Sequence, residues 1–255
     1  MTISYTIKPY KSIDSTNLEA KRLISQGVEN GTVIVAEYQS AGKGRLGRAW
    51  ESADGAGIWF SVILQPNLPM DQISLYSFVA AVSVAEGIRN VTGLDAQVKW
   101  PNDVLVNGRK LCGILLELVA ERNRPLSVII GIGINASQKP DDFPEEVRQK
   151  ATSLDMETGK ETNRQQVLDA VLQKLACYSE KLEQEGFASI KDIWSQLSCV
   201  TGKQVQIVQH GKALLYGTAM GLDADGALLV QTEQGMERIV AGDVSLRNAD
   251  GGYAI

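Results

Sequence analysis

Apolar and polar positions along the chain predict a sheet with helices packed against it. Three apolar runs have the length of strands, at 32–36, 58–64 and 126–134. The third is apolar throughout and reads as a central strand buried on both faces. Helical spacing predicts a first helix between a capping box at Thr16 and Glu19 and a stop at Gly27. Three more helices are predicted at 71–90, 164–185 and 187–197. The fold class is therefore α/β (α+β).

Two further apolar stretches flank Asn107-Gly108, which is the strongest short-range signal for a type I′ hairpin. The first stretch, 98–106, is expected to be one strand with a kinked entry, because Pro101 lacks an N–H group. The second stretch, 109–117, places Lys110 near the turn.

Beyond residue 200 the pattern changes to short strands separated by turns, at 204–209, 213–220, 227–231 and 236–240. This pattern predicts a small antiparallel β-barrel. We therefore expect two domains, 1–200 and 201–255. About fifty residues is near the lower limit for independent stability, so the barrel should lean on the larger domain. The polar segment 139–163 is expected to be a surface connection.

Composition narrows the class of protein. The net charge of −5 argues against a general nucleic-acid binder. No apolar run is long enough for a signal peptide or a membrane span, so a cytoplasmic protein with no membrane partner is expected. The three cysteines show no paired spacing. His210 is the only histidine, which excludes histidine triads and histidine-rich metal sites.

The loop at residues 39–50, called the basic loop below, contains three cations and three glycines and no acid. Glycines let a backbone approach a ligand, and Lys43, Arg45 and Arg48 suit phosphate or carboxylate. Its sequence also matches the dinucleotide fingerprint G-x-G-x-x-G. That fingerprint needs a following helix, whereas here a strand is predicted, so cationic side chains must take the place of a helix dipole. A mobile basic surface loop is the alternative.

Three other features fit either a site or ordinary structure. Ser15, Thr16 and Asn17 could cap a helix or face a polar ligand group. Asn102 and Asp103 follow the kink and could form a polar site or a sheet corner. In the predicted central strand, two glycines at period two, Gly131 and Gly133, clear one face for a flat apolar ligand or for a neighbouring helix.

Taken in order, four motifs resemble those of biotin protein ligases: residues 42–50, 99–103, 109–117 and 131–135. The resemblance implies a mixed-sheet catalytic domain of the biotin/lipoate ligase type followed by a small barrel. It also implies a two-step reaction. Biotin and Mg-ATP give biotinyl-5′-adenylate, and a lysine of a biotin carboxyl carrier protein then accepts the biotinyl group.

The resemblance also implies roles for individual residues. The residues implied to bind biotin are Ser15, Thr16, Asn17, Gln39, Lys43, Gly44, Arg45, Lys110, Gly113, Leu115, Gly131 and Gly133. Those implied to bind ATP or the adenylate are Arg45, Arg48, Trp50, Asn102, Lys110 and Asn135. Lys110, Arg45 and Asp103 are the implied catalytic residues. No metal ligand is assigned, since Mg²⁺ would be bound mainly through the phosphates of ATP.

Two departures from the family are visible. Many members have arginine where Lys43 stands, and a lysine lacks the bidentate fork. Some members carry an N-terminal helix-turn-helix domain, but only about a dozen residues precede the first predicted helix, so DNA binding is not implied. A homodimer through an exposed edge strand is possible. The alternative functions are a lipoate or octanoate ligase or transferase of the same fold and a non-catalytic RNA-binding adaptor.

Overall fold

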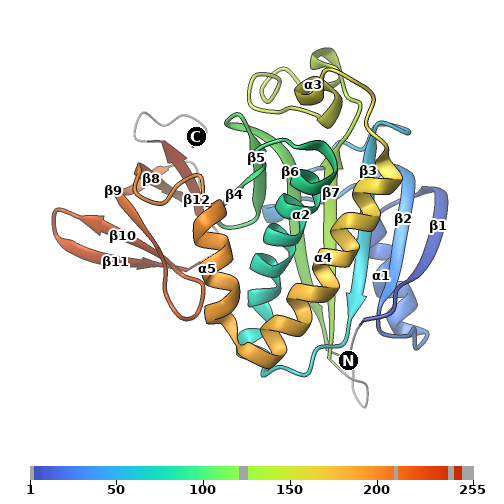
Figure 1. The fold of residues 1–255 in the computed structure, drawn as a ribbon, viewed down its shortest axis with the longest axis horizontal. Coiled ribbons are helices and arrows are strands. Elements are labelled where there is room, and N and C mark those ends of the chain that lie inside the picture. Colours follow the sequence, from blue (N-terminus) through green and yellow to red (C-terminus); the bar gives the residue numbers. More distant parts are fainter. Residues whose placement is uncertain (1–2, 121–125, 210–211, 241–243, 249–255) are drawn as a thin grey trace.

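The computed structural model describes residues 3–120, 126–209, 212–240 and 244–248. It contains a large seven-stranded sheet with helices on both faces and a separate five-stranded sheet beside it (Figure 1). His210 and residues 249–255 lie outside the described ranges.

The large sheet is mixed, with strand order β1-β2-β3-β7-β6-β5-β4. Only β1 and β2 pair in parallel, and every other neighbouring pair is antiparallel. Its strands are β1 (Thr6–Ile13), β2 (Thr32–Gln39), β3 (Gly57–Leu64), β4 (Gln97–Lys99), β5 (Asp103–Val106), β6 (Arg109–Val119) and β7 (Ser127–Asn135). The expected mixed sheet and the central position of the strand near 126–134 are confirmed.

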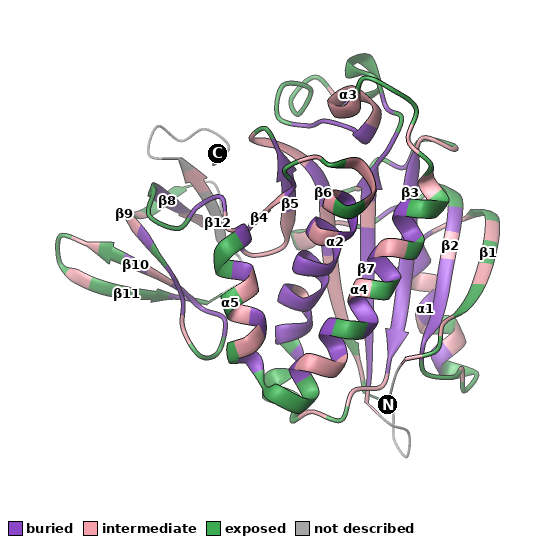
Figure 2. Ribbon diagram, in the orientation of Figure 1, coloured by how far each residue is buried: buried purple, intermediate pink, exposed green. Residues whose placement is uncertain are grey.

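Five α-helices accompany the sheet: α1 (Thr16–Ser25), α2 (Tyr76–Thr92), α3 (Leu154–Thr158), α4 (Arg164–Glu185) and α5 (Phe187–Leu197). Helices α2 and α4 pack on one face, and α1 covers the opposite face near β3 and β7 (Figure 1). Helix α2 is buried almost all round and ends at Gly93 in the left-handed conformation (Figure 2). At the crossing of α2 and α4, a Cβ on Gly87 would lie 2.8 Å from Val171 Cγ2, so only glycine permits this approach. None of the helices in the described ranges is long and apolar enough to cross a bilayer.

The expected single strand before the hairpin is not formed. Residues 98–106 are not one kinked strand, because the chain reverses between β4 and β5 and the two strands pair, with Lys99 opposite Asp103. A cis peptide bond joins Trp100 and Pro101 in this reversal. Pro101 has no N–H to continue a ladder, which explains why the strand stops there. The hairpin at Asn107-Gly108 is confirmed, with positive φ at both residues.

The capping box at Thr16 is also not formed. Helix α1 begins one residue earlier than such a box requires, with Ser15 as its N-cap. The Thr16 hydroxyl instead bonds Gln39 Oε1 at 3.1 Å, so it is not available to cap the helix.

The C-terminal sheet, β8 to β12, has strand order β11-β10-β9-β8-β12 and is antiparallel throughout. Its strands are β8 (Gln204–Gln209), β9 (Lys212–Leu222), β10 (Leu228–Thr232), β11 (Gly235–Ile239) and β12 (Val244–Asn248). Sequence reasoning missed β12. Within the described residues β11 and β12 form the two edges, so the strands make an open sheet there and not a closed barrel.

The C-terminal sheet shares one hydrophobic core with the larger part of the chain. Val205, Ile207 and Leu228 belong to the same buried cluster as Phe78 on α2 and Trp194 on α5. A turn of the C-terminal sheet touches the β4–β5 reversal, where Trp100 Nε1 donates to Gly226 O at 3.3 Å. The sheet therefore leans on the larger unit, as its small size predicts.

Candidate active site

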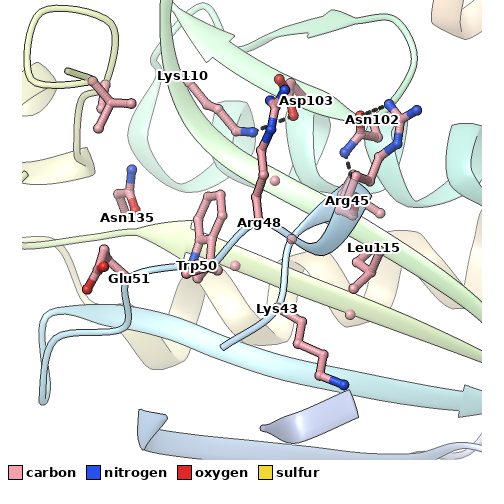
Figure 3. A pocket seen from close by; sticks show the side chains of 18 of the residues that line it. Lys43, Arg45, Arg48, Trp50, Glu51, Asn102, Asp103, Lys110, Leu115 and Asn135 are labelled. Atoms are coloured by element: carbon pink, nitrogen blue, oxygen red, sulfur yellow. Dashed lines mark hydrogen bonds and ion pairs between the residues drawn. The ribbon is translucent and has the colours of Figure 1, made fainter. Parts of the chain in front are cut away.

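A cavity of about 680 Å³ opens where the basic loop, the start of α1, the β4–β5 reversal and the middle of β6 and β7 meet. A cavity of this size holds a molecule of cofactor dimensions. The loops and strand ends around it come from positions far apart in the sequence (Figure 3).

The structure brings every site residue expected from the sequence to this one cavity. They are Ser15, Thr16, Asn17, Gln39, Lys43, Gly44, Arg45, Arg48, Trp50, Asn102, Asp103, Lys110, Gly113, Leu115, Gly131, Gly133 and Asn135. Their individual roles toward a ligand stay predictions.

One end of the cavity carries a buried polar network made of Thr16, Asn17, Gln39 and Ser61. Gln39 Oε1 accepts from the backbone N–H of Thr16 at 2.8 Å and from the Thr16 hydroxyl at 3.1 Å. The wholly buried Ser61 Oγ lies 2.7 Å from Thr16 Oγ1 and 2.6 Å from Asn17 Oδ1. These contacts join α1, β2 and β3 around the head of the cavity.

The basic loop folds into a compact turn and is followed by β3, so the prediction that no helix follows it is confirmed. Gly44 N donates to Arg48 O at 2.8 Å, and Leu46 takes a left-handed conformation at φ 59°. Arg45 Nη1 donates to Asn102 Oδ1 at 2.8 Å, which ties the loop to the β4–β5 reversal. The loop is thereby held across the mouth of the cavity.

The end of the cavity opposite the polar network is cationic. Lys110 Nζ lies 2.7 Å from Asp103 Oδ1 and 5.2 Å from the centre of the Trp50 ring. Figure 3 shows Arg48 reaching toward the same pair, whereas Lys43 extends away from it. The backbone of Lys110 is held on both sides, because its N–H donates to Lys150 O at 2.7 Å and its carbonyl accepts from Thr152 N at 2.9 Å.

The strand glycines make room for side chains of the protein itself. Gly113 and Gly133 are paired in register, and a Cβ on either would lie 2.6 Å from the Trp50 indole. A Cβ on Gly131 would lie 2.2 Å from Asn17 Oδ1. The expected open slot is thus partly occupied, and the glycines admit Trp50 and Asn17 to the cavity wall.

Some lining residues were missed from the sequence. Lys99 lies within a motif that sequence reasoning singled out, so its position offered a signal. Arg247 comes from β12 and had none. The segment 139–163 is more than a surface connection, because it contains α3, and Phe143, Val147 and Ala151 line the cavity.

Positive charge is concentrated around the cavity although the whole chain is acidic. Seven cations line it within the described residues: Lys43, Arg45, Arg48, Lys99, Lys110, Lys150 and Arg247. Three acids line it: Glu51, Asp103 and Glu146. Burial lowers the pKa of Lys99 to about 8, and the charge of Asp103 only partly opposes this effect. Such a surface suits a polyphosphate.

Neither a metal site made of protein ligands nor a reactive cysteine is supported by the described residues. The described residues contain no cluster of three acidic, histidine or cysteine side chains that could hold a metal ion. Burial raises the pKa of the Cys112 thiol well above its usual range, so this buried cysteine beside Gly113 is an inert packing residue.

Comparison with known proteins places the chain in a family. Residues 10–135 match the Biotin/lipoate A/B protein ligase family, and residues 200–247 match the Biotin protein ligase C terminal domain. The biotin--[acetyl-CoA-carboxylase] ligase of Paracoccus denitrificans is 34% identical over 236 residues, which cover 91% of this chain and 96% of that protein. The bifunctional ligase/repressor BirA of Bacillus spizizenii is 39% identical over 237 residues, covering 92% of this chain and 72% of that protein.

A solved structure agrees. The biotin protein ligase from Aquifex aeolicus in complex with biotin and ATP superposes with a TM-score of 0.84 at 34% identity, covering 96% of this chain and 99% of that one. The chain belongs to the biotin/lipoate protein ligase family. Within that family, its match to the C-terminal domain and its similar relatives put it with the biotin protein ligases.

Proposed function

We propose that the protein is an ATP-dependent biotin protein ligase. In the first step the carboxylate of biotin attacks the α-phosphate of ATP, and pyrophosphate leaves, which gives biotinyl-5′-adenylate. In the second step the ε-amine of a lysine on a biotin carboxyl carrier protein attacks the acyl carbon, and AMP leaves. Family membership and the relatives reported above support this assignment.

The observation that carries the choice of biotin is a shortage of donors in the polar network. Thr16 donates its hydroxyl proton to Gln39, and Ser61 has a single proton for two oxygens, Thr16 Oγ1 and Asn17 Oδ1. Thr16 Oγ1 and Asn17 Oδ1 therefore have lone pairs left to accept hydrogen bonds from a ligand with N–H groups. The ureido ring of biotin carries such groups, whereas the dithiolane ring of lipoate carries none and would leave this accepting capacity unused.

The cationic end fits the activation step. A carboxylate and a polyphosphate repel each other, so cations fixed at the meeting point lower the barrier by electrostatic stabilisation. Lys110 is fixed there by its backbone bonds to the 139–163 segment, and Arg45 and Arg48 reach the same region from the basic loop. Mg²⁺ would arrive with the phosphates of ATP and add positive charge to them.

Asp103 has a role in each step under this proposal. In the absence of ligands it orients Lys110 through the 2.7 Å ion pair. In the transfer step its carboxylate can accept a hydrogen bond from the incoming amine and help to remove its proton.

The partner is expected to be a biotin carboxyl carrier protein, and repressor activity is not part of the proposal. Cys112, Cys177 and Cys199 are free thiols, which suits the reducing cytoplasm that we propose as the location of the protein.

The outer edge of β1 is where a second copy of the chain could pair, and sedimentation velocity measures whether a homodimer forms.

A reconstituted reaction tests the proposal. Purified protein, biotin, Mg-ATP and a carrier domain should give a carrier with one added biotinyl group, seen by intact-mass spectrometry. Replacing biotin with lipoate should give no modified carrier. Lipoyl transfer without biotinyl transfer would make the protein a lipoate ligase, and transfer of neither would overturn the assignment.

The variant Lys110→Ala tests the site itself. It removes the cation paired with Asp103, so biotin-dependent pyrophosphate release should fall by about a hundredfold or more. The exposed Lys11 on β1 does not line the cavity, and Lys11→Ala serves as the control. Normal pyrophosphate release by Lys110→Ala would contradict the role of this lysine.

A further inference from the structure

Glu117 on β6 contacts the polar network from its outer side. Asn17 Nδ2 donates to Glu117 Oε2 at 2.7 Å, and Lys21 Nζ lies 2.6 Å from Glu117 Oε1. Glu117 lies two residues beyond Leu115, so both side chains are on the same face of β6 as the cavity. The Glu117 side chain is 23% exposed, which places its carboxylate at the rim of the site.

The carboxylate is ionised at neutral pH. Burial pushes the pKa of Glu117 upward, but the hydrogen bonds from Lys21 and Asn17 outweigh this effect and leave the pKa below its usual value. An ionised carboxylate only accepts hydrogen bonds.

This property fixes the orientation of the Asn17 amide. A primary amide has a donor end and an acceptor end, and turning it over exchanges the two. With an acceptor-only group on its outer side, Asn17 must direct Nδ2 to Glu117 and Oδ1 toward Ser61 and the interior of the site. Gly131 makes the inward position possible, since any larger residue there would collide with Oδ1.

We propose that Glu117 is a positioning residue for substrate recognition: it sets the polarity of Asn17 so that the head of the cavity presents oxygen acceptors to the N–H groups of the substrate. This inference rests on the proposed function, because it takes the ureido ring of biotin as the group recognised. Glu117 itself does not need to touch biotin.

Loss of the negative charge should release this orientation. In Glu117→Gln the new amide can donate to Asn17 Oδ1, so Asn17 can turn its Nδ2 inward. The cavity would then place a donor opposite the N–H groups of the substrate, and a buried hydrogen bond that is not made weakens binding. We therefore expect biotin to bind about tenfold to a hundredfold more weakly.

Calorimetric titration of biotin alone into the full chain measures this effect without catalysis. Lys21→Met is the matched control, because it removes the other partner of Glu117 and leaves the carboxylate facing Asn17. The half-exposed ion pair contributes little, so this variant should bind biotin within about threefold of the parent. The KM for ATP should stay unchanged in both variants.

A double variant separates positioning from a general structural role. Asn17→Asp alone places two carboxylates together and should bind biotin poorly. When it is combined with Glu117→Gln, the aspartate presents oxygen inward whichever way it turns, and the amide introduced at position 117 supplies the donor on the outer side. Biotin affinity should therefore recover in the double variant relative to either single variant.

The outcomes distinguish this inference from the proposed function. If the parent chain binds no biotin, the proposed function fails. If the parent binds biotin and Glu117→Gln binds equally well, only the role of Glu117 is overturned. Weaker binding by Glu117→Gln without recovery in the double variant also overturns it, because that result points to lost packing.

Discussion

At the scale of single residues, Arg45 ties the basic loop to the β4–β5 reversal through its 2.8 Å bond to Asn102. We predict that Arg45→Gly still forms the adenylate but releases it, because the loop loses its anchor and glycine adds freedom to the open state. Retention of the adenylate after gel filtration is the measurement. Lys11→Ala is the control, since Lys11 is an exposed cation of β1 that does not line the cavity. Equal retention by Arg45→Gly and the parent would refute the prediction.

Lys99 leads to a prediction about how the activity depends on pH. Its pKa of about 8 means that the free protein loses this buried charge above that pH. We expect kcat/KM for ATP to fall as pH rises through about 8, because kcat/KM follows the free enzyme, and we expect Lys99→Met to lack this part of the pH profile. An identical profile in the variant would show that another group titrates.

The same shift has a consequence for stability with a definite sign. The pKa of Lys99 is below that of an exposed lysine, so the unfolded chain binds more protons between about pH 8 and 10.5. Stability from this group therefore rises with pH across that window. The difference in unfolding free energy between the parent and Lys99→Met, followed from pH 7 to 10, measures it.

At the scale of secondary-structure elements, Glu157 on α3 joins the 139–163 segment to the β5–β6 hairpin. Its carboxylate accepts from Arg109 Nη2 at 2.7 Å, Asn107 Nδ2 at 2.8 Å and Thr152 Oγ1 at 2.6 Å. The side chain is only 3% exposed, so these bonds are sheltered from water. They hold in place the segment that fixes the backbone of Lys110.

We predict that Glu157→Gln raises the KM for ATP by about tenfold and lowers stability by about 1–3 kcal/mol, because a neutral amide cannot accept all three bonds. Biotin affinity should change little, since the polar network lies at the other end of the cavity. Steady-state kinetics and denaturant unfolding provide the measurements. The exposed Glu161, changed to glutamine, is the control in the same segment. An unchanged KM for ATP would remove Glu157 from this role.

Elements with strong local signals were predictable from the sequence. Helices α4 and α5 begin and end where their spacing and flanking residues indicate, and Asn107-Gly108 determines its hairpin by local backbone geometry. The candidate site residues come from short motifs and from the family resemblance, and the fold gathers them around one cavity, while their roles stay predictions.

What the sequence did not reveal depends on contacts between distant residues. Strand β1 is an edge strand with no buried position, so its apolar pattern is weak. Asn17 and Glu117 are a hundred positions apart, and nothing local indicates that they meet. Ser61 lies in β3, which is buried at every position, and the sequence alone does not show what its polar hydroxyl bonds. The structure shows that Thr16 and Asn17 are its partners.

At the scale of the whole molecule, one core runs through both sheets, so the chain should unfold in a single transition.

Gly226 lies at the junction between the C-terminal sheet and α2, and substitutions there test how tightly the two parts pack. Its φ is 82°, and a Cβ there would lie 2.4 Å from Phe78 Cε2 on α2. Gly202 has almost the same φ, 81°, but open space around it.

We predict that Gly226→Ala destabilises the protein by about 1–3 kcal/mol more than Gly202→Ala, because both variants strain the backbone but only the first overpacks the junction. Denaturant unfolding followed by tryptophan fluorescence compares them. Equal losses would mean that the two parts of the chain are not tightly packed at this turn.

The hydrogen bond from Trp100 to Gly226 and the contribution of Arg247 to the cavity also limit how the protein can be divided. If the chain is divided between α5 and β8, the first fragment loses the apolar residues that pack on Phe78 and loses Arg247 from the cavity. In the second fragment, the apolar residues of the C-terminal sheet lose their packing partners on α2 and α5. Neither fragment should label a carrier when made alone. When the two fragments are fused to two proteins that bind each other, labelling should return only where those proteins associate. The boundary between α5 and β8 is therefore a suitable position at which to divide the protein for a split reporter.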